Sequence, residues 1–120
     1  MPKPQVISDD ELDELFEKKE FSDRITQAAP KVAVIMTQGW CPEWVDMASW
    51  LTDDYPGVKV FQLVYDKHKR FNEIRMFKEN VFHSHAIPYV RYYHDGKLVA
   101  ESFYVWEDEF RGLLETGKSE

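Results

Sequence analysis

The architecture of this chain can be worked out from one segment, Lys31-Val-Ala-Val-Ile-Met-Thr-Gln-Gly-Trp-Cys-Pro-Glu-Trp44. Its first half, Lys31–Thr37, is almost continuously apolar and rich in β-branched side chains, which is typical of a strand buried on both faces of a sheet. A turn over residues 38–42 follows, and Pro42 suits the first turn of a helix, where a missing N–H is not needed. The segment therefore predicts a buried strand that leads directly into a helix, with Cys41 at the junction.

Strands and helices alternate on both sides of this segment. Before it, residues 4–7 fit a short strand, and Ser8 and Glu11 have the spacing of a capping box at a helix start. Residues 21–30 have no clear period and leave room for one more helical turn. Beyond the segment, the apolar periods and turn residues predict a helix to about Asp54, a strand over 58–65, a helix over 67–78, a helix over 106–114 and a frayed tail over 116–120.

The last third of the sequence changes to a period of two. Residues 87–94 and 97–104 are predicted to form two strands around Asp95-Gly96, a dipeptide that strongly favours a hairpin. Hairpin strands are antiparallel, whereas strands separated by helices pair in parallel, so the sheet is mixed. We predict a single α/β domain over residues 1–120, with a mixed sheet of four or five strands flanked by helices on both faces. Most aromatic side chains of this region are expected in the core, and an exposed cluster would instead offer a partner-binding surface: Tyr89, Tyr92, Tyr93, Phe103, Tyr104 and Trp106.

Composition limits the possible partners. The 120 residues are 43% hydrophobic, and 15 Lys plus Arg against 22 Asp plus Glu give a net charge of −7. Nucleic acids and anionic membranes attract cationic surfaces, so we expect neither as a partner. No apolar run approaches the roughly 20 residues of a membrane span, and the first residues lack an apolar signal segment, so we expect a cytoplasmic protein. The single cysteine excludes a disulfide within the chain and a multi-cysteine zinc site.

Cys41 is the residue with the clearest chemical potential. The amides and the positive dipole end at a helix N-terminus stabilise a thiolate, which is the reactive form. Glu43 and Asp46 act in the opposite direction because like charges repel. No Lys or Arg lies between Lys31 and Lys59 to compensate. A reactive thiol and an inert one therefore both remain open from the local sequence.

The element order, Trp40-Cys41 after the buried strand, Ile87-Pro88 before the hairpin and Asp95-Gly96 within it together make residues 6–114 resemble the thioredoxin family. The resemblance implies a thioredoxin-like fold, with Cys41 as the catalytic nucleophile and Pro88 preceded by a cis peptide bond beside the sulfur. It also implies two groups of substrate-binding residues. Trp40, Pro42 and Trp44 would bind substrate beside the thiol. Ile87, Pro88 and Tyr89, ahead of the hairpin, would bind it through their backbone.

The sequence also departs from that family. Trp44 stands where thioredoxins have their second cysteine, so no resolving thiol is present. Ile35 and Gln62 stand where thioredoxins have a buried aspartate and its lysine partner. Tyr104 replaces a glycine beside the substrate groove and is expected to crowd it. Trp40 and Trp44 are expected either to form a lid over the sulfur or, for one of them, to pack on the sheet.

These features predict an atypical monothiol thiol-disulfide oxidoreductase. Cys41 would form a mixed disulfide with a protein or low-molecular-weight substrate, and an external thiol such as glutathione would resolve it. No cofactor is expected, and a monomer is. The alternative is a non-catalytic protein-binding or scaffold module on the same fold, for which the missing cysteine and the missing buried acid both argue.

The histidines suggest a less favoured site. His83 and His85 precede Pro88 in a loop expected to pass near Cys41, and zinc accepts such ligands. Residues two apart in an irregular loop rarely converge, so we expect solvent-facing histidines and no metal; His68 and His94 are expected at the surface. A peroxidase is set aside, because Gln38 stands where peroxiredoxins have a threonine three residues before the cysteine.

Overall fold

A five-stranded mixed sheet forms the centre of the computed structural model, which describes residues 2–52 and 55–118. The strand order is β1-β3-β2-β4-β5. The first three strands in sequence run parallel, whereas β4 pairs antiparallel with β2 and β5 pairs antiparallel with β4. The strands are β1 (Gln5–Val6), β2 (Lys31–Thr37), β3 (Val58–Val64), β4 (Tyr89–His94) and β5 (Lys97–Ser102).

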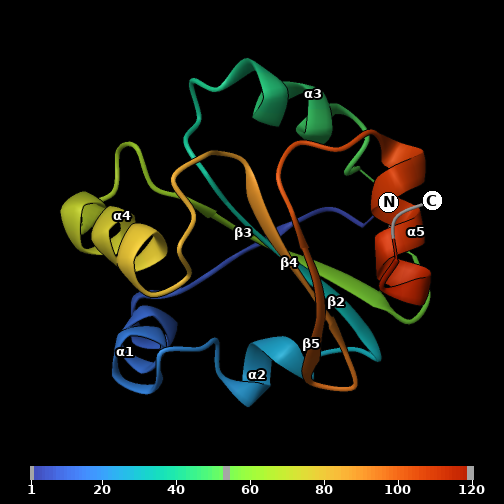
Figure 1. Cartoon of the computed structure of the whole chain (residues 1–120), viewed down its shortest axis with the longest axis horizontal. Helices are drawn as coiled ribbons and strands as arrows, with labels where there is room; N and C mark the ends of the chain where they lie inside the picture. The colour runs from blue at the N-terminus through green and yellow to red at the C-terminus, as the bar shows by residue number, and fades with distance from the viewer. Residues whose placement is uncertain (1, 53–54, 119–120) are drawn as a thin grey trace.

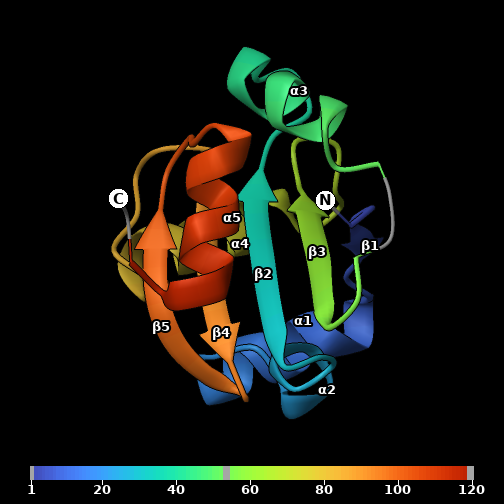
Figure 2. The ribbon, with the colours of Figure 1, turned by 90° about the vertical axis from the view of Figure 1, so that its right-hand side faces the viewer.

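Helices cover both faces of the sheet (Figures 1 and 2). One face packs against side chains of the N-terminal helices and α4, and the other against α3 and α5. Figure 2 shows α3 across the end of the sheet to which β2 and β3 point. The helices are α1 (Asp9–Lys18), α2 (Asp23–Thr26), α3 (Pro42–Ser49), α4 (Phe71–Asn80) and α5 (Glu107–Thr116). The predicted mixed α/β architecture is confirmed.

Strand β2 contributes to both hydrophobic cores. Val32, Val34 and Met36 belong to the core beneath α1 and α4, while Ala33 and Ile35 belong to the core beneath α3 and α5. Successive side chains of a strand point to opposite faces, so a strand covered on both sides has to be apolar throughout. This is why the run Lys31–Thr37 is uninterrupted in sequence.

Within the described part of the chain, no helix has both the length and the apolar character needed to cross a membrane.

Several predicted boundaries differ from those of the structure. The helix expected to reach Asp54 ends at Ser49, because the N–H groups of Trp50 and Leu51 bond three residues back, to the carbonyls of Met47 and Ala48. Asp54 itself lies outside the described residues, as do the last two residues of the expected tail. Helix α4 begins at Phe71 rather than 67, since turns occupy the preceding residues. Strand β4 begins at Tyr89 rather than 87, β5 ends at Ser102 rather than 104, and α5 continues to Thr116.

A buried arginine joins β4 to the segment between α1 and α2. The Arg91 guanidinium donates to Glu20 Oε2 at 2.6 Å and to the Tyr93 hydroxyl at 2.8 Å. It also lies over the Phe82 ring, 3.9 Å from the centroid. A buried charge needs such partners to offset its desolvation. The arginine faces the core beneath α1 and α4, and it takes no part in the surroundings of Cys41.

The capping box at the start of α1 provides a test of helix stability. The Ser8 hydroxyl accepts a hydrogen bond from the Glu11 N–H at 3.3 Å, and the Glu11 carboxylate accepts one from the Ser8 N–H at 3.0 Å. We expect Ser8→Ala to lower the free energy of unfolding by about 0.5–2 kcal/mol, and the matched control Ser8→Gly by only about a few tenths. Urea denaturation measures both; equal losses in the two variants would contradict a capping role.

Candidate thiol site

Cys41 lies at the junction of β2 and α3, as predicted. It is the N-cap residue of α3, and Pro42 is the first residue of that helix. Its N–H donates to the Gln38 carbonyl at 3.1 Å, and its carbonyl accepts from the Val45 N–H at 3.0 Å. The residue is only 4% exposed and belongs to the core beneath α3 and α5. The thiol is thus placed at a helix N-terminus but held within apolar packing.

The turn that precedes Cys41 is held from the neighbouring strand. Asp66 follows β3, and its Oδ1 accepts a hydrogen bond from the Gly39 N–H at 2.8 Å. A Cβ on residue 39 would lie 3.3 Å from the same oxygen, so a larger residue would press on this bond. We did not predict Asp66 as a site residue. The signal was available, because parallel neighbouring strands bring their carboxyl ends to one edge of a sheet.

Ile87 and Pro88 lie beside the end of β2. Met36 pairs with Tyr89 across the antiparallel ladder, which places the preceding proline next to Thr37. The Ile87–Pro88 peptide bond is cis, and the Ile87 side chain packs against the apolar cluster that contains Cys41. The Tyr89 side chain lies in the opposite core, where its hydroxyl accepts from Arg91 and donates to Glu101. Of the three residues predicted ahead of the hairpin, Ile87 therefore packs against the cluster that contains Cys41, Pro88 lies at the end of β2, and Tyr89 lies in the other core.

The two tryptophans of the motif have different environments. Trp44 is 7% exposed and packs in the same core as Cys41, which corresponds to the predicted packing on the sheet. Trp40 is 64% exposed, and its Nε1 donates to Gln38 Oε1 at 2.6 Å. Pro42 is exposed beside it. The two sequence neighbours of Cys41, Trp40 and Pro42, are therefore exposed, while Trp44 packs in the interior with it.

The positions that depart from thioredoxins lie next to one another. Ile35 and Gln62 are register partners on β2 and β3, and Ile35 is fully buried in the cluster with Cys41. Tyr104 donates from its hydroxyl to Asp46 Oδ2 at 2.6 Å, which connects the segment after β5 to α3. This bond to a carboxylate, together with burial, raises the pKa of Tyr104. The interior behind the thiol is apolar, and its polar contacts lie at the rim.

The histidines do not gather around Cys41. His85 Nδ1 lies 3.5 Å from Glu79 Oε1, and His83 is exposed. Within residues 2–52 and 55–118, no group of three or more His, Cys, Asp or Glu residues is arranged to hold a metal ion. His68 and His94, which we expected at the surface, are partly exposed there and also make polar contacts. Both are half-buried: His68 Nδ1 accepts from the Arg70 N–H at 2.9 Å, and His94 Nε2 contacts the Leu114 carbonyl.

A buried lysine holds the loop ahead of Pro88. Lys78 on α4 is 1% exposed, and its Nζ donates to the carbonyls of Ser84 at 2.8 Å and Ala86 at 3.2 Å. Burial lowers the pKa of this lysine, because desolvation disfavours the charged form. Sequence reasoning missed this residue, since a lysine in the last turn of an amphipathic helix is normally solvated. Lys78 therefore positions the loop that carries Ile87 and Pro88.

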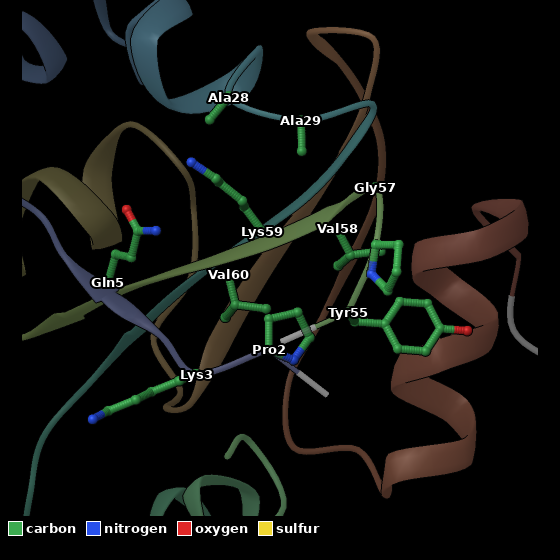
Figure 3. Close-up of a pocket in the computed structure, with 11 residues that line it drawn as sticks. Pro2, Lys3, Gln5, Ala28, Ala29, Tyr55, Gly57, Val58, Lys59 and Val60 are labelled. Atoms are coloured by element: carbon green, nitrogen blue, oxygen red, sulfur yellow. The ribbon is translucent and has the colours of Figure 1, made fainter. Parts of the chain in front are cut away.

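A hollow away from the thiol lies at the start of β3, between β1 and the α2–β2 connection (Figure 3). It encloses about 560 Å³. The described residues that line it include Lys3, Lys59 and Tyr55 but no Cys, His, Asp or Glu. It therefore provides neither a nucleophile nor a carboxylate, and it lies apart from the Cys41 site.

Replacing Lys78 tests its positioning role. We expect Lys78→Met to lower the free energy of unfolding by about 1–3 kcal/mol at pH 7, because the Ser84 carbonyl loses its buried donor. In the unfolded chain Lys78 keeps its proton up to its ordinary pKa of 10.5, whereas in the folded protein its lowered pKa means that the proton is lost at a lower pH. The free energy of unfolding of the wild type should therefore increase relative to that of Lys78→Met as the pH rises toward 10.5.

Urea denaturation at several pH values from 7 to 10 measures this difference. The exposed Lys67→Met is the matched control and should change stability by less than about 0.5 kcal/mol at any pH. A Lys78→Met variant as stable as the wild type would show that the loop does not depend on the lysine.

No protein-family model and no curated protein sequence matches this chain. Solved structures do match. Thioredoxin O1 from Arabidopsis thaliana superposes with a TM-score of 0.66 at 14% identity, covering 94% of this chain and 96% of that one. Spinach chloroplast thioredoxin f gives a TM-score of 0.66 at 16% identity, covering 98% and 95%.

A thioredoxin mutant from Halobacterium salinarum gives a TM-score of 0.62 at 18% identity, covering 95% of this chain and 89% of that one. Identities this low say nothing about activity. The three structures nevertheless agree with this chain in architecture along nearly its whole length, as the resemblance in sequence implied. The chain therefore has the thioredoxin fold.

Proposed function

We propose that this protein carries out thiol-disulfide exchange through the single thiol of Cys41. The observation that carries the proposal is the position of this residue at the N-cap of α3, directly after β2, the strand whose Met36 pairs with Tyr89 just beyond Ile87 and Pro88. A helix N-terminus favours a thiolate. An extended substrate segment would lie along Ile87 and Pro88, as the resemblance to thioredoxins implies.

The reaction needs one external thiol. The Cys41 thiolate attacks one sulfur of a disulfide R–S–S–R′, forms a bond to the R sulfur and releases R′S⁻, which takes up a proton. A low-molecular-weight thiol R″SH, such as glutathione, then loses its proton and attacks the R sulfur of the mixed disulfide. The products are R–S–S–R″ and the regenerated Cys41 thiolate. The net change is an exchange of thiol partners, with no cofactor, and we propose that a monomer performs it.

The surroundings of the thiol favour selectivity over speed. The residue is almost fully buried, so a substrate sulfur reaches it only after neighbouring side chains move. Glu43 and Asp46 lie on the same helix, and their charges slow the approach of anionic small molecules such as glutathione disulfide without preventing the reaction. We therefore propose a protein disulfide, or a protein carrying a small-thiol cap, as the substrate, with free glutathione serving as the resolving thiol.

One observation favours a second candidate function. Trp44 occupies the place of a second cysteine and packs beside Cys41, leaving the thiol enclosed. A fold that has lost both the resolving thiol and the buried acid suits a non-catalytic protein-binding module. In that case the chemistry of Cys41 has no role, and the exposed aromatic side chains near it form the functional surface.

The rate of Cys41 alkylation separates the two functions. We expect iodoacetamide to alkylate Cys41 in the folded protein faster than the chain unfolds, because a helix N-terminus stabilises the reactive thiolate. Oxidised glutathione should add a single adduct, seen by intact mass, and reduced glutathione should remove it. Cys41→Ser is the matched control and should show neither reaction.

The rate at which the chain unfolds, measured in urea and extrapolated to water, is the reference for the alkylation rate. A thiol that reacts only as fast as the chain unfolds, or that gives no removable adduct, would rule out exchange at Cys41 and leave the binding module. Thermal unfolding of the Cys41→Ser variant should match that of the wild type within a few degrees. This check separates a loss of chemistry from a loss of fold.

A further inference from the structure

A groove of about 340 Å³ opens between α3 and the connection from β5 to α5. Figures 1 and 2 both show the end of α5 that follows this connection beside α3. Cys41 does not line the groove, so it is distinct from the thiol site. Its lining combines aromatic rings with carboxylates from both sides: Asp46, Trp50, Tyr104, Trp106 and Glu107.

The two tryptophans of the groove differ in exposure and packing. Trp50, the C-cap residue of α3, packs edge-on against Phe110 with ring centroids 5.2 Å apart. Trp106, the N-cap residue of α5, is 73% exposed and makes no side-chain capping bond. A largely exposed indole beside a fixed one is unusual, because large aromatic side chains normally find burial. The open indole face is free to stack with a ligand.

The charge around the groove is negative. Asp46 accepts from the Tyr104 hydroxyl through Oδ2, and Glu43 lies close enough to contribute to the raised pKa of Tyr104. On the opposite side are Glu107 and Asp108 in the first turn of α5. Arg111 lies 3.8 Å from each of these two carboxylates and offsets part of their charge. The elements on the two sides of the groove therefore carry these four carboxylates, two of which pair with Arg111.

We propose that this groove binds the cationic side chain of a lysine or arginine in an extended, basic segment of a partner protein. A guanidinium or ammonium group over the Trp106 indole gains cation–π attraction, and carboxylates at the rim accept its hydrogen bonds. The volume suits a long side chain with its flanking backbone. A second copy of this chain is the wrong occupant, because a protein of net charge −7 would bring like charge to an acidic groove.

The inference extends beyond the proposed exchange at Cys41 and does not require it. Exchange at Cys41 leaves the groove available, since Cys41 is not among its lining residues. Asp46 is on the same helix as Cys41, so a bound segment would also lie near the thiol. A peptide without cysteine tests the groove alone.

The experiment uses the wild-type chain and a hexapeptide of alternating Arg and Ala. Titration followed by the NMR signal of the Trp106 indole N–H should show saturable binding. The matched peptide with citrulline in place of Arg keeps the shape and removes the charge, and it should bind at least about fivefold more weakly. Affinity for the Arg peptide should fall as salt rises from 0.05 to about 0.5 M. Equal binding of the two peptides, or no shift of the Trp106 signal, would overturn the proposal.

Variants assign the binding to this groove. Trp106→Ala and Asp46→Asn should each weaken binding of the Arg peptide about two- to fivefold. Met76→Ala, which removes an exposed apolar side chain on α4, and Asp10→Asn, which removes a carboxylate on α1, are the matched controls and should leave it unchanged. Equal weakening by Asp10→Asn would show attraction to the overall charge and would also overturn the proposal. Unfolding midpoints confirm that each variant is folded.

Discussion

The burial of β2 on both of its faces is the constraint on which the rest of this structure depends. The strand pairs with β3 on one side and β4 on the other, and its residues from Val32 to Met36 are fully buried. Both hydrophobic cores include its side chains, so neither helical layer can form without it. Because α3 begins directly after this strand and its short turn, the same constraint determines where Cys41 lies.

The thiol site is apolar inside and is held in place by polar contacts from outside. Asp66 fixes the turn before Cys41, Lys78 fixes the loop before Pro88, and Tyr104 fixes α3 through Asp46. Each contact joins residues that are distant in sequence or belong to different elements. None of them touches the sulfur. These three contacts therefore hold the backbone segments around the thiol from outside.

The differences between prediction and structure have particular physical causes. Helix α3 ends at Ser49 because its last turn tightens to bonds that span three residues, a choice between near-equal geometries that sequence does not specify. Lys78 was missed because its side chain turns inward to satisfy two carbonyls of a loop whose path was unknown. Trp40 and Trp44 have similar local sequence, and only their positions on opposite sides of the turn decide that one is exposed and the other buried.

The sequence by itself determined the order of the elements, the mixed sheet and the position of Cys41 at a helix start, because periodicity, turn residues and capping act over short distances. It also excluded a second thiol. The tertiary structure alone decided that the thiol is enclosed, that Ile35 and Gln62 lie side by side behind it, and that Trp50 and Trp106 form a groove with acidic residues of two helices. Exposure and convergence depend on contacts between distant segments, which no local pattern contains.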